Sequence, residues 1–420
     1  MKGITLVKLF TILAVLPLLL FSCNKDAPQQ VQNVAAAEVV TPVSNEGKII
    51  PNQYIVILKD AAVAPAISYA NGPFTDRAAK SQFMKEKSTI VIDQLNRFLI
   101  DQEIDPTKVL AYYTAVMSGF AIQLTEAEYE KLSKNNKVAS LEHDREESLP
   151  DFKIESIDNS GARAQTTPCG ITRAGGAANA GTARWIWIVD TGIDLDHPDL
   201  NVQTSYSATF AGGTANDCNG HGTHVAGTAA ARNNSIGVVG VAANAPVVAV
   251  KVFSCSGSGS TSGILSGLNH VASNDLAGDV VNMSLGGYYG NGCSTGSSYR
   301  TILNSLSNAG TRVASAAGNS SAHAKYYQPA CVNAPNVLTV ASMTCSRNWS
   351  SFSNYGRGPC DFIATGSSVY STYLNGGYAT LSGTSMATPH VAGIMQVRNA
   401  LPRSSGSVSN RGASYPIAVR

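Results

Sequence analysis

The sequence predicts two folded regions: a larger α/β region whose parallel sheet is covered by helices on both faces and, before it, a small α+β region. From residue 166 to 420, short and nearly continuous apolar runs alternate with helical patterns, which is typical of parallel strands buried on both faces. Between residues 48 and 145, charged residues are frequent, cysteine is absent and strand-like runs enclose helical patterns. A chain of 420 residues is long enough for both regions.

Residues 1–22 have the pattern of an export signal, because two lysines precede an apolar run from Leu9 to Phe21 that is too short to span a bilayer comfortably. The run ends in Leu-Phe-Ser-Cys at 20–23, which resembles the lipobox of bacterial lipoproteins. We therefore expect cleavage before Cys23 and lipidation of its thiol, which would anchor the precursor to the cell-envelope membrane. Ordinary signal cleavage, in which Cys23 has no role, is the alternative. Residues 23–47, rich in Ala, Gln, Val and Pro, indicate a flexible tether.

The region from 48 to 145 predicts elements in the order βαββαβ. The predicted elements are a strand at 54–58, a helix from about 78 to 100, a strand region at 109–124, a helix opened by the capping pattern Thr125-Glu126-Ala127-Glu128, and a strand near 138–141. This order suits a ferredoxin-like fold, a small antiparallel sheet with two helices on one face. Residues 146–165 are polar and rich in small residues, which indicates a linker and a place for proteolytic processing.

The region from 166 to 420 alternates strands with helices. Strands are predicted at 185–189, 247–250, 280–281, 313–314 and 337–340, and helices near 221–232, 262–274, 298–308 and 385–400. Functional residues are expected at the carboxyl ends of these strands, where open parallel sheets assemble their sites.

Charge and cysteine content limit the function classes. A net charge of +2 argues against a protein that binds nucleic acid, which would carry an obvious basic stripe. Export implies an oxidising compartment, so the seven cysteines after Cys23 are expected to form mostly disulfides, with at least one free thiol because seven is odd. No Cys-x-x-Cys pair occurs, which argues against a zinc ribbon.

Asp190 and His221 are the first two candidates for chemistry. The strand at 185–189 ends in Asp190-Thr191-Gly192, which places a carboxylate at a strand end, although an Asp there can also be a turn residue. In Gly220-His221-Gly222-Thr223-His224, His221 lies at the start of a helix and is the better base, whereas His224 is expected to be structural. Two histidines three apart could bind metal, but the zinc protease pattern His-Glu-x-x-His is absent.

Ser385 is the third candidate, in the stretch Gly383-Thr384-Ser385-Met386-Ala387-Thr388-Pro389-His390. Small residues let the backbone turn sharply, and the apolar run after Pro389 can enter a buried helix. The hydroxyl would then lie at a helix N-terminus, where the dipole favours developing negative charge. A lone serine in this position is more often an ordinary N-cap, so its partners decide its role.

The three stretches together resemble the signatures of subtilisin-like serine proteases of the peptidase S8 family, in the same chain order. The resemblance covers about residues 165–420, and the region before it resembles the family's I9 inhibitory propeptide. It implies a serine endopeptidase made as a self-processing zymogen, with protein and peptide substrates and its own propeptide as partners. The enzyme would be either a membrane-anchored lipoprotein of the cell envelope or, after propeptide cleavage, an enzyme released outside the cell. Asp190, His221 and Ser385 would form the catalytic triad.

The resemblance also implies an oxyanion hole and a substrate cleft. The Asn319 side chain and the Ser385 backbone N–H would bind the oxyanion. Substrate would lie as an added strand between Gly257-Ser258-Gly259 and Ser284-Leu285-Gly286. Ala316, Ala317 and Gly318 would line an open, uncharged first pocket with a preference for apolar or aromatic residues.

Disulfide and metal expectations come from the proteinase K-like and aqualysin-like members. Cys218 and Cys255 are expected to pair, and Cys169, where relatives often carry Trp, is the candidate free thiol; the pairing of Cys293, Cys331, Cys345 and Cys360 stays open. A structural Ca²⁺ is expected on the Pro335 and Val337 carbonyls and the Asp361 carboxylate. No cofactor is implied for catalysis.

Two rival interpretations remain. Gly292-Cys293-Ser294-Thr295-Gly296 matches the esterase elbow, with Asp361 and His390 later in suitable order, but no strand precedes it. His390 more simply suggests helix packing. A surface binding protein with an inactive protease fold is the second rival, and the complete triad with its oxyanion donor argues against it.

Overall fold

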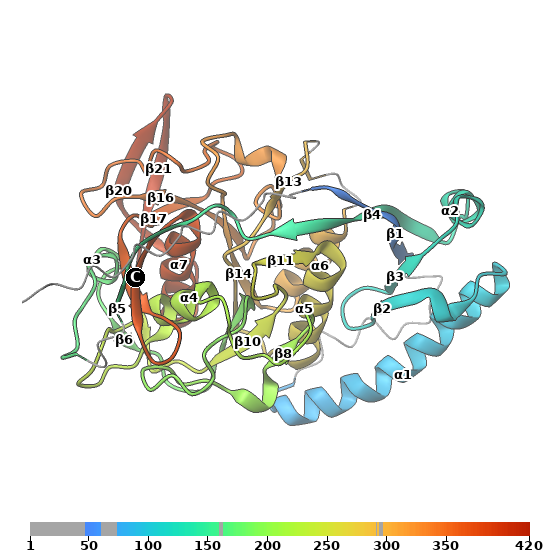
Figure 1. The fold of residues 1–420 in the computed structure, drawn as a ribbon, viewed down its shortest axis with the longest axis horizontal. Coiled ribbons are helices and arrows are strands. Elements are labelled where there is room, and N and C mark those ends of the chain that lie inside the picture. Colours follow the sequence, from blue (N-terminus) through green and yellow to red (C-terminus); the bar gives the residue numbers. More distant parts are fainter. Residues whose placement is uncertain (1–46, 60–73, 159–162, 291, 294–296) are drawn as a thin grey trace, which may run out of the picture. The chain divides into compact units, whose positions relative to one another are not determined.

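The computed structural model describes residues 47–59, 74–158, 163–290, 292–293 and 297–420 (Figure 1). The predicted signal, residues 23–46 of the predicted tether with Cys23, and Ser294 of the esterase-like motif lie outside these residues. Within the described ranges, no helix combines the length and the apolar character needed to cross a membrane.

The N-terminal region has the predicted βαββαβ order. Its elements are β1 (Ile49–Leu58), α1 (Arg77–Asp101), β2 (Val109–Tyr113), β3 (Gly119–Gln123), α2 (Glu126–Ser133) and β4 (Val138–Ser148). The four strands form an antiparallel sheet in the order β4-β1-β3-β2. The predicted capping box opens α2, since the Thr125 hydroxyl accepts from Glu128 N–H and the Glu128 carboxylate accepts from Thr125 N–H.

Strand β1 shows how this region attaches to the rest of the chain. Tyr54 and Val56 pack into the region's own core, whereas Ile55 and Ile57, on the opposite face, join a core shared with two helices of the larger region. Because successive strand residues point to opposite faces, one face of this sheet packs against the helices of the N-terminal region and the other face packs against the larger region.

The larger region contains the predicted parallel sheet. Its nine strands have the order β20-β21-β17-β16-β14-β12-β7-β10-β8, with β20 antiparallel to β21 and the other pairs parallel. The bounds are β7 (Ile186–Asp190), β8 (Ala208–Thr209), β10 (Val247–Lys251), β12 (Val280–Met283), β14 (Arg312–Ala316), β16 (Val337–Met343), β17 (Phe362–Thr365), β20 (Arg403–Asn410) and β21 (Ala413–Val419).

Helices cover both faces of this sheet, as predicted. Ile186 and Ile188 pack against α4 (His221–Ala230) and α7 (Thr384–Arg398), whereas Trp187 and Val189 pack against α5 (Thr261–Asn274) and α6 (Ser298–Asn308). Figure 1 shows these two pairs of helices. The remaining elements are α3 (Cys169–Arg173), β5 (Lys153–Asp158), β6 (Ala178–Asn179), β9 (Ala242–Ala243), β11 (Ser258–Ser260), β13 (Gly287–Tyr288), β15 (Tyr327–Gln328), β18 (Val369–Thr372), β19 (Tyr378–Ser382) and the short 3₁₀ turns η3 (Pro106–Lys108), η4 (Thr204–Tyr206) and η5 (Ala324–Tyr326).

Two segments differ from the sequence prediction. The predicted linker at 146–165 contains the end of β4 and the whole of β5, because both segments find strand partners that are distant in sequence. Beyond residue 400, where the sequence indicated no element, β20 and β21 form a hairpin, and Ile417 of β21 pairs with Ile363 of β17.

The prediction that Cys169 is the free thiol is wrong. Cys169 forms a disulfide with Cys345, with the two Cα atoms 6.2 Å apart, and Arg173 on the same short helix donates to the Cys345 carbonyl at 2.9 Å. Among the described cysteines the free one is Cys360, whose pKa burial raises to about 12. Residue types in relatives could not reveal the approach of two segments 176 residues apart.

The expected pair Cys218–Cys255 is confirmed, with Cα atoms 4.9 Å apart. Cys293 pairs with Cys331, so the structure gives the pairing of two cysteines whose partners the sequence left open.

Candidate active site

Asp190 and His221 form a buried pair at the carboxyl end of the parallel sheet. Asp190 is the last residue of β7, and His221 is the first residue of α4. The carboxylate Oδ1 lies 2.8 Å from His221 Nδ1, and both side chains are fully buried. An aspartate so placed fixes the imidazole orientation and leaves Nε2 as the nitrogen available to a third group.

Glycine makes this close packing possible. Gly220, the N-cap of α4, has φ 101°, a backbone conformation that favours glycine. A Cβ at Gly222 would lie 2.1 Å from the Gly192 carbonyl oxygen and 3.2 Å from Asp190 atoms. The sequence Gly220-His221-Gly222 therefore brings the start of α4 against the strand end that carries Asp190.

Ser385 lies in the first turn of α7, and Pro389 shapes its surroundings. Proline has no N–H, so the Ser385 carbonyl, four residues earlier, lacks its helical donor. It accepts a hydrogen bond from the Ser284 hydroxyl at 2.7 Å, and the Ser385 hydroxyl in turn donates to the Ser284 carbonyl at 3.1 Å. Ser284 directly follows β12, so a neighbouring strand end supports the serine.

His221 Nε2 is buried and has no hydrogen-bond partner among the described residues, while the Ser385 hydroxyl points to Ser284. Hydrogen bonds of this kind are often incomplete before a reaction begins and tighten along its course. Among the described residues, His221 is therefore bonded to Asp190 and Ser385 to Ser284, with no hydrogen bond between Ser385 and His221.

Asn319 lies beside the start of α7 in a fixed orientation. Its Oδ1 accepts from the Thr384 N–H at 2.8 Å and from the Thr384 hydroxyl at 2.7 Å, so its Nδ2 is free to point the other way. That Nδ2 donates to the carbonyl oxygen of Asp151 at 2.6 Å. A side-chain amide donor beside a serine and bonded to a peptide carbonyl is the arrangement an oxyanion hole requires.

The chain's own residues 146–158 run through this site. Residues 146–148 of β4 pair antiparallel with β11, and Leu149 N–H donates to the Gly257 carbonyl at 2.9 Å. The Phe152 ring lies 4.8 Å from the His221 ring. Beyond it, β5 pairs antiparallel with β19, the strand that leads to Ser385. Figure 1 shows β4 reaching β11 from the N-terminal region.

Of the residues predicted to bind substrate, three contact this segment directly. Gly257, Ser258 and Gly259 receive the added strand, as the sequence suggested, except that the strand belongs to the chain itself. Ser284 contacts Ser385, Leu285 is fully buried in the shared core, and residues 284–286 take part in none of the strand pairings found between described residues. Ala316 and Ala317 are buried, and Gly318 N–H donates to the Thr384 hydroxyl at 3.1 Å.

Comparison with known proteins identifies the family of this chain. Residues 181–408 match the model of the subtilase family, Peptidase_S8, and residues 53–149 match the model of peptidase inhibitor I9. The chain belongs to the subtilase family. It is a serine-type endopeptidase with an I9 propeptide domain.

Relatives cover most of the chain. An extracellular serine proteinase of Thermus sp. strain Rt41A is 35% identical over 82% of this chain and 79% of its own length. Subtilisin Savinase of Lederbergia lenta is 44% identical over 55% of this chain and 83% of its own length. A solved cold-adapted subtilisin-like serine proteinase has 36% identity and a TM-score of 0.47, covering 58% of this chain and 90% of that one.

The propeptide domain binds the α5 and α6 side of the catalytic domain through acidic caps. Asp144 accepts from Ser262 N–H at 3.0 Å in the first turn of α5, and Glu142 accepts from Ser298 N–H at 2.7 Å at the start of α6. Both carboxylates meet helix N-termini, where the dipole and the unpaired N–H groups favour negative charge.

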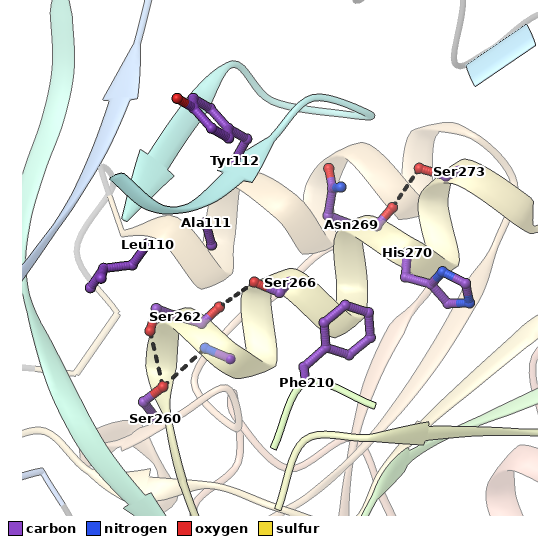
Figure 2. Close-up of a pocket in the computed structure, with 11 residues that line it drawn as sticks. Leu110, Ala111, Tyr112, Phe210, Ser260, Ser262, Ser266, Asn269, His270 and Ser273 are labelled. Atoms are coloured by element: carbon purple, nitrogen blue, oxygen red, sulfur yellow. Dashed lines mark hydrogen bonds between the residues drawn. The ribbon is translucent and has the colours of Figure 1, made fainter. Parts of the chain in front are cut away.

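Two buried ion pairs join α1 of the propeptide to the catalytic domain. Arg77 donates to Asp279 at 2.7 Å with side-chain exposures of 7% and 0%, and its guanidinium lies 3.9 Å from the Trp185 ring centroid. Lys80 contacts Asp275 at 2.5 Å. Figure 2 shows a pocket lined by residues of β2 and α5, and Asp190, His221 and Ser385 are not among its lining residues.

Glu147 occupies a buried position between the two domains. Its carboxylate accepts from the Thr261 hydroxyl at 2.8 Å and from the hydroxyl of Tyr289, with Tyr299 at 3.4 Å. Burial raises the pKa of Glu147 to about 7, and the nearby Asp144 carboxylate acts in the same direction. Sequence analysis missed this residue because an acidic residue in a polar segment gives no sign of burial.

The other histidines of the motifs are structural. His224 Nε2 lies 2.9 Å from the Val369 carbonyl, and burial lowers its pKa to about 3. His390 is buried in α7, where Gly170 packs so closely that a Cβ would lie 2.2 Å from the ring. Both outcomes agree with the sequence prediction. Cys293 of the esterase-like motif is held in a disulfide.

The predicted Ca²⁺ ligands lie near the start of β16. Asp361 Oδ2 accepts from Thr339 N–H at 2.8 Å, two residues after Val337, and burial raises the pKa of Asp361 to about 6. The donors expected here are all oxygens, which fits Ca²⁺. In the described part of the chain, three or more His, Cys, Asp or Glu side chains do not gather at any point that could hold a metal.

Proposed function

We propose that this endopeptidase is exported as a latent precursor and works through a triad of Asp190, His221 and Ser385, with Asn319 as an oxyanion donor. The observation that carries the proposal is the buried Asp190–His221 contact at 2.8 Å beside an Asn319 amide that already holds a peptide carbonyl. Latency is supported by the pairing of residues 146–148 with β11, the strand on which we propose that substrate binds.

The proposed reaction follows from these positions. Ser385 Oγ attacks the peptide carbonyl and passes its proton to His221 Nε2, while Asp190 stabilises the imidazolium. The oxyanion accepts from Asn319 Nδ2 and from the Ser385 backbone N–H. His221 then protonates the leaving amine, and water hydrolyses the acyl-enzyme by the reverse sequence of proton transfers.

The preference that we propose is for apolar or aromatic residues before the cut bond. Ala316, Ala317 and Gly318 bring no charged side chain to the proposed first pocket, and small side chains leave it open. A panel of peptides that differ at this position tests the preference by kcat/KM, and equal rates for Phe and Glu would contradict it.

Anchoring and calcium complete the proposal. The lipobox-like stretch at 20–23 would lipidate Cys23 and tether the precursor to the membrane through residues 24–47. The Pro335 and Val337 carbonyls with Asp361 would hold a structural Ca²⁺ whose charge offsets the buried carboxylate. A chelator should then lower the melting temperature, and an unchanged value would exclude a significant site.

Labelling with a fluorophosphonate tests the catalytic assignment. The label should attach to Ser385 in the processed enzyme and be lost in Ser385→Ala, while Ser294→Ala should label normally. Attachment to Ser294 would instead support the esterase interpretation. The Ser385→Ala precursor should also stay uncut in a purified system, and normal processing of that variant would rule out self-cleavage.

A further inference from the structure

We propose that the first self-cleavage breaks the peptide bond between Asp151 and Phe152. This inference rests on the proposed function and names the bond on which the triad first acts. Asp151 would then be the last residue of the released propeptide, and Phe152 would be the first residue of the catalytic part.

The Asp151 carbonyl is already bound by the side chain that we propose as the oxyanion donor. Asn319 Nδ2 donates to its oxygen at 2.6 Å, and the other end of the same amide bonds to Thr384, the neighbour of Ser385. The carbonyl is thus tied through one side chain to the residue next to the nucleophile. A donor in this place would strengthen its bond as charge develops on the oxygen.

Strand pairing on both sides aligns the chain across Ser385. Before the bond, residues 146–148 pair with β11, and after it Lys153 pairs with Ser382 at the start of the β5–β19 register. Ser382 is three residues before Ser385. The bond at 151–152 therefore lies between the two paired segments, where a substrate held as an extended strand would place its reacting carbonyl.

Phe152 supplies the amine that must leave. Its ring lies 4.8 Å from the His221 ring, so this residue is next to the base that would protonate the amine. Phe152 also lies close to Gly383, because a Cβ added to Gly383 would be 3.4 Å from the Phe152 Cβ. By contrast, residue 164 near the far end of the predicted processing segment pairs with Ile236, and residue 166 just beyond that segment pairs with Val238.

The step balances without a further reactant except water. The Ser385 Oγ–carbon bond forms, the Asp151–Phe152 carbon–nitrogen bond breaks, and the Ser385 proton moves through His221 to the Phe152 amine. Water then cleaves the ester, which regenerates the Ser385 hydroxyl and leaves a carboxylate on Asp151.

The side chain of Asp151 sets the expected speed of this cut. Asp151 is exposed, and a carboxylate suits the proposed uncharged first pocket poorly. An apolar residue at this position should gain pocket contacts in the transition state. Asp151→Leu should therefore be processed faster than the native chain, by about tenfold or more.

The test is a time course of the purified precursor, followed by intact mass and N-terminal sequencing. The first fragments should meet at 151–152 and sum to the precursor plus one water. Phe152→Pro should lose this cut, because a proline nitrogen is constrained and crowded, and the matched variant Phe152→Leu should keep it.

The outcomes separate this inference from the proposed function. If the native precursor is cut in a Ser385-dependent manner but its first new terminus is not Phe152, the inference is wrong and the proposed triad stands. If the native precursor and the Ser385→Ala variant yield the same fragments at the same rate, the proposed function itself fails.

Discussion

Asn319 connects two groups that the reaction must bring together, since its oxygen bonds to Thr384 and its nitrogen to the carbonyl of Asp151. Asn319→Ala should slow the first-order self-cleavage of the precursor by about 100- to 1000-fold, because an oxyanion donor is lost. The exposed Asn348→Ala is a matched control and should be processed at the native rate. A rate for Asn319→Ala within tenfold of native would contradict the role.

Glu147 predicts a pH dependence of propeptide binding. Its pKa is raised from 4.5 to about 7 in the bound state, so binding is strongest below about pH 4.5 and is lost progressively as pH rises toward 7. Burial also raises the pKa values of Glu142 and Asp144, which adds to the same trend. The dissociation constant of the cleaved complex should rise by roughly two orders of magnitude over this range.

The neighbours of Glu147 define the control for that measurement. Tyr289, Tyr299 and Thr261 surround its carboxylate with hydroxyl groups, and these groups stay neutral in this pH range. Glu147→Gln keeps the size and much of the hydrogen bonding but cannot ionise, so its dissociation constant should depend less steeply on pH. An unchanged slope in the glutamine variant would show that other groups dominate.

At the scale of elements, α1 offers a direct comparison of buried and exposed ion pairs. Arg77→Ala would leave Asp279 without its cation, and release of the cleaved propeptide should become at least tenfold faster. Arg97, on the same helix, pairs with Asp93 at side-chain exposures of 74% and 58%. Arg97→Ala should change the release rate less than twofold, because exposed pairs contribute little. Equal effects of the two variants would refute the argument.

Sequence patterns predicted those helices and strands whose burial follows one regular pattern along their length. The runs at 185–189 and 247–250 became β7 and β10 because strands buried on both faces are apolar throughout. The predicted helix at 385–400 corresponds to α7, at Thr384–Arg398. The motif around Ser385 placed the hydroxyl at the start of that helix, but it did not reveal that Pro389 frees the Ser385 carbonyl for Ser284.

Elements formed by long-range pairing were not predicted. β5 has five exposed residues out of six, so its composition resembles a linker, and its strand conformation depends on β19, more than 200 residues later. Likewise, β20 is rich in serine, and it forms a strand because it pairs with β21, which joins the edge of the large sheet. Single-sequence periodicity carries no information about such partners.

For the whole molecule, the Cys169–Cys345 disulfide links the start of the catalytic domain to the loop after β16. Removing both thiols in Cys169→Ser/Cys345→Ser should lower the melting temperature of the processed enzyme by about 5 to 10 °C, because a loop of 176 residues is no longer closed. Scanning calorimetry measures the change. A native-like melting temperature would show that packing around α3 stabilises this part of the enzyme without the disulfide.

The pairing of β5 with β19 implies that latency has two components with different responses to dilution. After a cut at 151–152, the propeptide is a separate chain, so diluting the sample promotes its dissociation. β5 stays covalently joined to the catalytic domain, and its effective concentration at β19 is independent of the protein concentration. Dilution alone should therefore open the β11 side of the cleft and leave the β19 side filled until β5 itself is removed.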